Sequence, residues 1–215
     1  MGKEINRIRL NRLYSENNIF EEITFHDGVN IILGEKYDDR SVKGRKTNGV
    51  GKSMSIEFLD FCFLNDYEKS RIVKIPKEVF PVEENVILDL DIGQETVTIK
   101  RNRKQADKPI LIREGKTVSF DKIQDARDYL TGIIFSKLNG KKVPSFRNLF
   151  SILMRDERSE FTDIIKCHDL TKKIPDDLSA HLYLLGFSPE AYKNTIETIR
   201  EIEAVSTVLT KEKKN

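Results

Sequence analysis

The stretch VNIILGEKYDDRSVKGRKTNGVGKS, residues 29–53, decides which fold this chain of 215 residues is expected to adopt. It follows an Asp27-Gly28 turn, and its opening residues are mostly apolar up to Gly34, which predicts a short, central, buried strand. Its last residues are rich in glycine, and a largely apolar segment from Lys52 to Leu64 then predicts a helix. Strand, glycine-rich loop and helix, in this order, form the arrangement that binds nucleotide phosphates.

The segment Asn48-Gly49-Val50-Gly51-Lys52-Ser53 matches the end of the phosphate-binding loop pattern, whereas a lysine stands at the first glycine of that pattern. Gly49 and Gly51 allow backbone N–H groups to turn toward an anion at the start of the helix. Lys52 is expected to reach the β and γ phosphates of ATP, and the Ser53 hydroxyl to bind Mg²⁺. The predicted ATP site consists of Asn48, Gly49, Val50, Gly51, Lys52, Ser53 and Met54. The alternative is a glycine-containing turn that only caps a helix.

An insertion interrupts the glycine loop. Gly34 stands where the first glycine of the pattern normally lies, and residues 35–46 separate it from the rest. The cations of this insertion are Lys36, Arg40, Lys43, Arg45 and Lys46. They would add contacts to the phosphates if the insertion folded over the nucleotide. A mobile, solvated loop is the alternative.

The rest of the chain predicts a mixed fold, an α/β class in the form of an α+β lobe. Residues 4–14 and 19–25 alternate apolar with polar side chains and predict two early strands with one solvated face. Residues 86–120 predict an antiparallel β meander. Further helices are expected at 123–134 with Asp121 as the cap, after Pro144 through Leu153, and at 178–185 before Gly186.

From Pro189 onward the sequence predicts an amphipathic helix. Its apolar residues, at spacings of three or four or close to them, are Ala191, Ile196, Ile199, Ile202, Val205 and Leu209. This pattern favours the start of a coiled coil, although it is shorter than the three to four heptads that identify one. The alternative is a terminal helix packed on its own domain. We predict a head lobe over residues 1–188 and the beginning of a coiled-coil helix over residues 189–215.

Composition limits the possible environments of the protein. The chain has 37 Lys and Arg against 35 Asp and Glu, so its net charge of +2 gives no global argument for binding nucleic acid or membrane. No apolar run approaches the roughly 18 residues of a spanning helix, and no apolar signal core follows the charged N-terminus. Cys62 and Cys167 are too far apart in sequence to form a recognisable metal-ligand pair. We predict a reduced, cytoplasmic protein that does not contact a membrane.

Three other groups of residues are candidates for a catalytic or binding site. Cys167 lies beside His168 but lacks the separate base and orienting group of a nucleophilic site, so no catalytic residue is predicted in the chain. His26 and His181 are isolated, which is typical of surface or core histidines. The basic run 100–104, with Lys108 nearby, is expected at a hairpin tip, either touching a nucleic-acid backbone or simply solvated.

The strand pair, the VNIILG strand, the NGVGKS loop, the meander and the start of a long helix together resemble a family. They are similar to the N-terminal lobe of the SMC, RecF and RecN class of ABC-type ATPases. Within that class they are similar to the coiled-coil ATPases of bacterial defence operons, including three-component ABC systems. The resemblance implies ATP-driven work on DNA, as in DNA repair, or in antiviral defence. It also implies a homodimer in which two heads sandwich ATP.

The resemblance further implies a C-terminal lobe that carries the signature motif and the Walker B Asp-Glu, and neither occurs in this sequence. The expected Q-loop region, residues 144–157, contains no glutamine. Ser151 and Arg155 are the candidate substitutes, and the alternative is an amphipathic structural helix. Two hypotheses therefore stay open, an ATPase lobe that needs its C-terminal half and a non-hydrolysing nucleotide-binding module that recruits a partner through its terminal helix. A P-loop kinase is a weaker third, because it would need strands alternating with helices in a parallel sheet.

Overall fold

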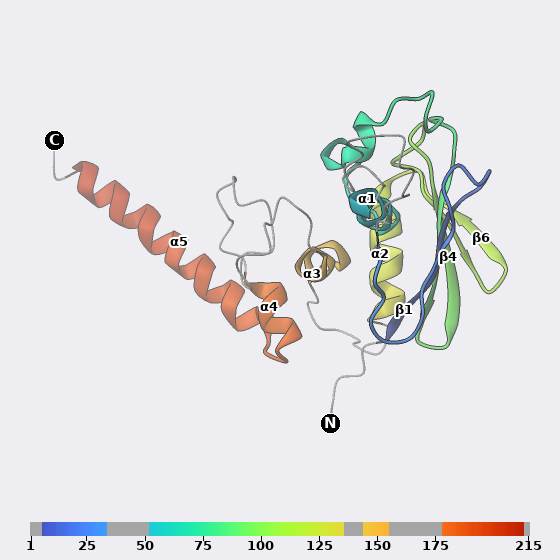
Figure 1. Cartoon of the computed structure of the whole chain (residues 1–215). Coiled ribbons are helices and arrows are strands. Elements are labelled where there is room, and N and C mark those ends of the chain that lie inside the picture. The colour runs from blue at the N-terminus through green and yellow to red at the C-terminus, as the bar shows by residue number, and fades with distance from the viewer. Residues whose placement is uncertain (1–5, 34–51, 136–143, 155–177, 213–215) are drawn as a thin grey trace.

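The computed structural model describes residues 6–33, 52–135, 144–154 and 178–212 of the chain. A six-stranded sheet of order β2-β1-β3-β4-β5-β6 forms the body, and each pair of neighbours is antiparallel (Figure 1). The strands are β1 (Ile8–Ser15), β2 (Ile23–Thr24), β3 (Val86–Ile92), β4 (Glu95–Arg101), β5 (Ile110–Arg113) and β6 (Lys116–Ser119). The predicted mixed class, the first strand and the meander are confirmed, and the antiparallel pairing does not fit the kinase alternative.

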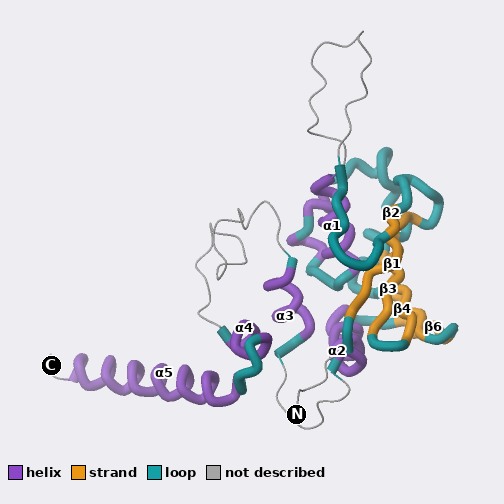
Figure 2. Tube along the Cα trace, turned by 60° about the horizontal axis from the view of Figure 1, so that its bottom comes forward, coloured by secondary structure: helices purple, strands orange, loops and turns teal. Residues whose placement is uncertain are grey.

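Helices cover one face of this sheet. α1 (Lys52–Cys62) packs against β3 and β4, and α2 (Ile123–Ile134) lies on the same side of the sheet (Figure 1). The other described helices are α3 (Phe146–Leu153), α4 (Ser179–Leu184) and α5 (Pro189–Glu212), and there are short 3₁₀ turns η1 (Tyr67–Lys69) and η2 (Arg71–Lys74). α5 points away from the sheet (Figure 2).

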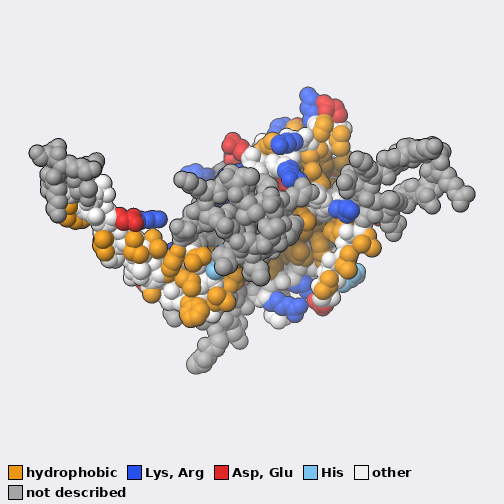
Figure 3. All heavy atoms as spheres, turned by 60° about the vertical axis from the view of Figure 1, so that its left-hand side comes forward, with side chains coloured by type: hydrophobic (Ala, Val, Ile, Leu, Met, Phe, Trp, Pro, Cys, Tyr) orange, Lys and Arg blue, Asp and Glu red, His pale blue; other side chains and the backbone are white. Residues whose placement is uncertain are grey.

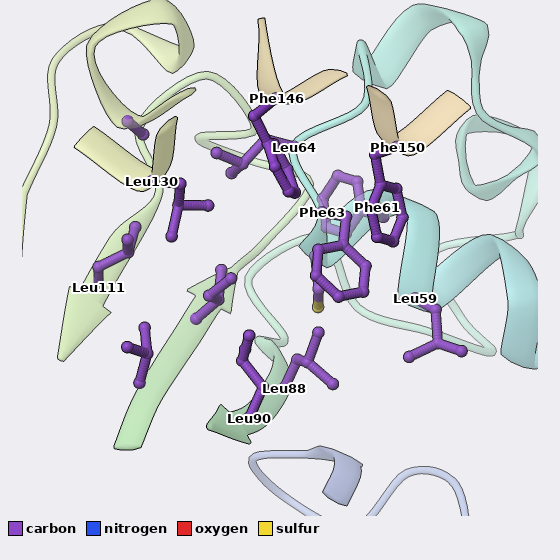
Figure 4. Close-up of a cluster of buried hydrophobic side chains, with 14 of the residues drawn as sticks. Leu59, Phe61, Phe63, Leu64, Leu88, Leu90, Leu111, Leu130, Phe146 and Phe150 are labelled. Carbon is purple, nitrogen blue, oxygen red and sulfur yellow. The ribbon is translucent and has the colours of Figure 1, made fainter. Parts of the chain in front are cut away.

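The core lies between the sheet and these helices, and the strands supply it through every second residue. In β4, Val97, Ile99 and Arg101 are buried, whereas the side chains between them are partly exposed. Figure 4 shows side chains of β3 and β5 facing Phe61 and Phe63 of the α1 region and Leu130 of α2. The alternation in the sequence is therefore the reason why one face of the sheet receives helices.

The opposite face of the sheet is polar. Arg12 of β1 donates from Nε and Nη2 to Asp89 Oδ2 of β3, at 2.9 and 2.8 Å. The Thr98 hydroxyl of β4 donates to the other oxygen of Asp89 at 2.6 Å. These three residues are cross-strand neighbours, so the ladder follows directly from the register. An antiparallel sheet with one face packed and one face in water is the expected form of such a pattern.

The predicted central strand at residues 29–33 is wrong for the structure described. These residues form no strand, and Val29, Ile31 and Leu33 are 89%, 74% and 76% exposed. The turn before them is well defined, because the Asn30 side chain accepts from the His26 N–H at 2.8 Å and donates to the His26 carbonyl at 2.9 Å. This turn leads the chain away from the short edge strand β2, and no described strand pairs with the apolar segment that follows.

The predicted cap of α2 is also wrong. α2 has Lys122 at its N-cap, without a side-chain hydrogen bond. The Asp121 carboxylate lies instead 3.2 Å from the Lys108 ammonium. The group expected to cap the helix therefore forms an ion pair.

The C-terminal helices begin and end close to where the sequence predicts. The Ser145 hydroxyl caps α3 by accepting from the Asn148 N–H at 3.3 Å. α4 stops before Gly186, whose φ of 85° suits glycine, and α5 begins at Pro189. From Ile199 onward the apolar side chains of α5 are exposed, so this part of the helix is not packed on the other described residues. Hydrophobic side chains along this part of the molecule are visible in Figure 3. In the described part of the chain, no helix has both the length and the apolar character to cross a bilayer.

Candidate functional site

The predicted helix after the glycine loop is α1, and it begins at Lys52. Lys52 and Ser53 are exposed in its first turn, and Met54 is half-buried against the core. Residues 48–51 of the predicted site, like the insertion at 35–46, lie outside the described residues. The structure therefore places Lys52, Ser53 and Met54 together at a helix start, and the other predicted site residues directly precede them in sequence.

The N-terminal end of α1 suits an anion. Helix N–H groups without intrahelical partners and the positive end of the helix dipole favour negative charge there. The first turn of α1 contains no acidic residue that would supply this charge from within the helix. Lys52 adds a full positive charge on an exposed side chain. The site can attract a phosphate group by these three features together.

The metal expected with ATP would take few ligands from this end of α1. Mg²⁺ prefers oxygen ligands and is commonly held by one or two protein oxygens together with phosphates and water. Ser53 offers one hydroxyl oxygen in the first turn, which fits that pattern. Among the described residues, no group of three or more His, Cys, Asp and Glu side chains could form a metal centre built from protein alone.

The opposite end of α1 closes in a tight turn. The Asn65 N–H donates to the Asp60 carbonyl at 3.1 Å, and the Leu64 N–H donates to the Phe61 carbonyl at 3.0 Å. This pair of bonds is the Schellman motif, in which glycine usually takes the left-handed position. Here Leu64 takes it with φ 62°, and its side chain is fully buried. Burial of the leucine thus offsets a strained backbone.

Arginines from three other elements bind the last carbonyls of α1 and of its closing turn. Arg101 of β4 donates to the Phe61 and Asn65 carbonyls at 2.6 and 2.7 Å. Arg127 of α2 donates from Nε and Nη2 to the Leu64 carbonyl at 3.0 and 2.7 Å. A third, Arg147 of α3, donates to the Phe63 carbonyl at 3.1 Å. Cations at a helix C-terminus are stabilising, so the fold itself satisfies this end of the helix.

Arg101 is the most buried of these arginines, at 1% exposed. Its guanidinium stacks 4.1 Å from the Phe61 ring centroid and also donates to the Ala106 carbonyl at 2.6 Å. Burial lowers the pKa of Arg101 to about 10, so the side chain still carries its charge at neutral pH. Burial also raises the pKa of the neighbouring Cys62 thiol, which stays protonated. This chemistry supports α1 and offers no reactive group to a ligand.

In the basic run at residues 100–104, Arg101 and Arg103 are buried and cannot reach a phosphate backbone. Arg101 and Arg103 alternate with outward residues and point into the protein, where Arg103 donates to the Ile72 and Ile75 carbonyls at 3.1 and 2.6 Å. Only the lysines agree with the alternative of a solvated hairpin. They pair with carboxylates, namely Lys100 with Glu16, Lys104 with Glu83 and Lys108 with Asp121.

The structure adds two residues near the start of α1 that sequence reasoning missed. Glu57 is buried, and its carboxylate accepts from the Ser70 hydroxyl and the Arg71 N–H, both at 3.0 Å. Arg71 Nε lies 3.8 Å from the second oxygen of Glu57. Glu57 is one turn after Ser53 on the same helix face, and helical side chains lean toward the N-terminus. Arg71 thus lies beside Glu57, one helical turn after Ser53. The sequence signal that could have revealed this pair is a glutamate inside a largely apolar helix, because a buried carboxylate needs hydrogen-bond or ion-pair partners.

The other sequence candidates form no site in the described residues. His26 is exposed, and His181 is half-buried in α4. Cys167 and its neighbour His168, together with Arg155, lie outside the described residues, and the side chain of Ser151 is not described either. α3 buries Phe146, Leu149 and Phe150 in the core, as the alternative of an amphipathic structural helix predicts.

Comparisons of this chain with protein-family models, with curated proteins and with solved structures found no match. The two ends of α1 and the exposed apolar residues of segment 29–33 and of α5 are therefore the features that bear on function.

Proposed function

We propose that this chain is the ATP-binding lobe of an SMC-like coiled-coil ATPase, with a P-loop formed by residues 48–54. One observation carries the proposal. The described part of α1 starts at Lys52, next in sequence to Gly49 and Gly51, and its first turn exposes Lys52 and Ser53 and contains no acidic residue. Such a helix start, preceded by glycines that free the backbone N–H groups, is suited to a phosphate.

Each residue has a distinct role in this proposal. The backbone N–H groups of residues 48–54 surround the phosphates, and Lys52 contacts the β and γ phosphates. The Ser53 hydroxyl supplies one ligand to Mg²⁺, and the phosphates supply others. Arg71, which lies 3.8 Å from the Glu57 carboxylate, is a second cation beside α1, one turn after Ser53. None of these groups activates water, so hydrolysis requires residues from a C-terminal lobe.

The exposed segment 29–33 supports the need for a second lobe. Val29, Ile31, Ile32 and Leu33 are an exposed apolar run that continues from the edge of the sheet. Apolar strand-like segments exposed at a sheet edge mark a surface that normally has a partner. In the proposed ATPase the C-terminal lobe covers this segment and completes the strand expected before the loop. The exposed apolar residues of α5 support the proposed coiled coil in the same way.

The wider role follows from the family resemblance alone. In the proposed assembly two heads sandwich ATP as a homodimer in the cytoplasm and act on DNA or in antiviral defence. The inward position of Arg101 and Arg103 removes one surface that would have supported DNA binding. DNA therefore stays the weakest of the proposed partners.

The test is Mg²⁺-dependent ATP binding and steady-state ATP hydrolysis, measured in one preparation of the chain. We expect wild type to bind ATP without turnover, and Lys52→Ala to bind at least about tenfold more weakly, a difference of about 1.4 kcal/mol. Lys116→Ala, on the exposed edge strand β6, is the matched control and should bind as wild type does. Wild type that binds no ATP would contradict the proposal for this lobe.

The exposed apolar face of α5 also favours a second candidate, a non-hydrolysing nucleotide-binding module that recruits a partner through this helix. The two functions differ in the fate of ATP in the natural assembly. Phosphate release by the protein isolated with its native partners supports the ATPase lobe. ATP that stays bound and intact in the same preparation supports the module.

A further inference from the structure

The sheet has one fully formed edge strand that is left uncovered. β2, at one edge, has 2 residues, whereas β6, at the other, pairs with β5 along all 4 of its residues. In the described residues β5 is the only strand that pairs with β6, and Figures 1 and 2 show no described helix beside its outer side. A sheet edge of this kind is a template for pairing with another strand.

The β5–β6 hairpin decides which backbone groups of β6 point outward. The strands meet at the tight turn Glu114-Gly115, with φ angles of 48° and 74°. Beyond the other end of β6, the Phe120 N–H donates across the hairpin to the Pro109 carbonyl at 3.2 Å. The backbone groups of successive residues in an antiparallel strand point alternately to its two sides. Thr117 and Ser119 therefore present their N–H and C=O groups to the uncovered side.

These outward groups are complementary to those of a second copy of the chain. In an antiparallel pair about a two-fold axis at Val118, Thr117 of each copy lies opposite Ser119 of the other, and the two residues exchange hydrogen bonds. Val118 then lies opposite Val118 of the second copy, a contact that suits β-branched side chains. Val118 of β6, with Ile110 and Ile112 of β5, is half-buried at this edge. A second copy would therefore also cover apolar surface.

Charges beyond the two ends of β6 favour this register. Glu114 and Lys122 are exposed and lie beyond opposite ends of the strand. The axis at Val118 brings Glu114 of each copy near Lys122 of the other, so the opposite-charge pair occurs twice by symmetry. An axis at Ser119 would instead place Lys116 opposite Lys122, and like charges across a strand pair are destabilising.

We infer that β6 is a homodimer contact through which two copies of this chain join their sheets edge to edge, with the two-fold axis at Val118. The contact uses none of the candidate ATP-site residues. It is therefore a second association surface, separate from the proposed dimer that encloses ATP, and it forms with or without nucleotide. Because the paired strands are short, the dimer is weak and forms at high protein concentration.

Cysteine crosslinking tests the register. Val118→Cys, Thr117→Cys and Ser119→Cys are made in a Cys167→Ser background, in which the remaining Cys62 is buried. In the proposed pair the two Val118 Cα atoms are about 4.5 Å apart, within the range of a disulfide, whereas residues 117 and 119 lie about 8 Å from their own copies. We expect mild oxidation to link Val118→Cys into dimers at least about tenfold faster than the other two variants. Equal rates, or faster linking at residue 117 or 119, would overturn the proposed pair.

Sedimentation velocity over a series of protein concentrations tests the contact without oxidation. Thr117→Pro removes an outward N–H group and leaves the pairing with β5 in place, because proline is tolerated where the N–H of an edge strand faces solvent. The shift toward dimer that we expect for wild type should be lost. Thr117→Val keeps the backbone donor and, as the matched control, should keep the shift. Segment 29–33 and α5 are the same in both variants, so association that persists in Thr117→Pro would overturn the β6 contact.

A charge exchange tests the same contact without proline. Glu114→Lys and Lys122→Glu each bring like charges together and should reduce the dimer fraction, and the double variant should restore it. A double variant that dimerises no better than the single variants would overturn the inference, as would a wild type that stays monomeric at every concentration. The measurements are made without nucleotide. Wild type that dimerises through β6 but binds no ATP would support this contact and contradict the proposed function.

Discussion

The two ends of α1 differ in how their charge is balanced. At the C-terminal end, carbonyls of the helix and its closing turn accept from Arg101, Arg127 and Arg147, all from other elements. At the N-terminal end, Lys52 and Ser53 are exposed and the first turn has no acidic residue. The helix dipole favours a cation near the C-terminal end and an anion near the N-terminal end. The protein provides the cations at the C-terminal end, and the negative charge of a ligand at the N-terminal end would complete this pattern.

The largest effect on stability is expected at the C-terminal end of α1. Arg101→Met removes the donor of the Asn65 and Ala106 carbonyls and leaves the Phe61 carbonyl with only the Leu64 N–H, so the free energy of unfolding should fall by about 4 kcal/mol. Urea denaturation measures this loss. The control is Arg113→Met at the end of β5, where the Arg113–Glu95 pair is about one-third exposed and should contribute less than about 1 kcal/mol. Equal losses in the two variants would contradict the assigned role of Arg101.

The next effect concerns the strained turn. Leu64→Ala should cost about 3 kcal/mol, because a buried leucine is lost while the left-handed backbone stays unfavourable. Leu64→Gly should cost about 2 kcal/mol, since glycine accepts φ 62° without strain. Thermal and urea unfolding of both variants test this order. A glycine variant less stable than the alanine variant would show that the backbone at Leu64 is not strained.

A smaller effect depends on pH. Hydrogen bonds from Lys69 and Arg127 lower the pKa of Asp66 to about 2, below the value of about 3.9 for an unfolded chain. A lowered folded-state pKa gives stability that is present above about pH 4 and is lost as pH falls toward 2. Because Asp66 is 40% exposed, we expect at most about 1 kcal/mol. The difference in unfolding free energy between wild type and Asp66→Asn should therefore shrink between pH 5 and pH 2, and a constant difference would exclude this linkage.

The smallest effect on stability is expected in segment 29–33, which precedes the candidate loop and the N-terminal end of α1. Ile31→Ser should change the unfolding free energy by less than about 0.5 kcal/mol, because Ile31 is already exposed. The same substitution should reduce self-association at high protein concentration, as sedimentation velocity can measure. A large loss of stability would mean that segment 29–33 packs within this lobe.

Much of the fold could be predicted because its signals are local. The alternation in β3 and β4, the apolar period of α2 and the proline at residue 189 each specify an element through nearby residues. The site was predicted in part for the same reason, since a glycine pair before Lys52 identifies a helix start. Glu57 and Arg71 were not predicted, because they are separated in sequence and only the packing of η2 on α1 brings them together.

The sequence alone determined the mixed class, most element boundaries and the chemistry of the candidate loop, since backbone propensity and hydrophobic period act over a few residues. Only the tertiary structure decided which charges face inward. Arg101 and Lys100 are adjacent in one basic run, yet Arg101 lies in the core and Lys100 pairs on the surface, because the strand register assigns them to opposite faces. The exposure of residues 29–33 was decided in the same way, because an apolar strand is buried only where another strand or layer is present to cover it.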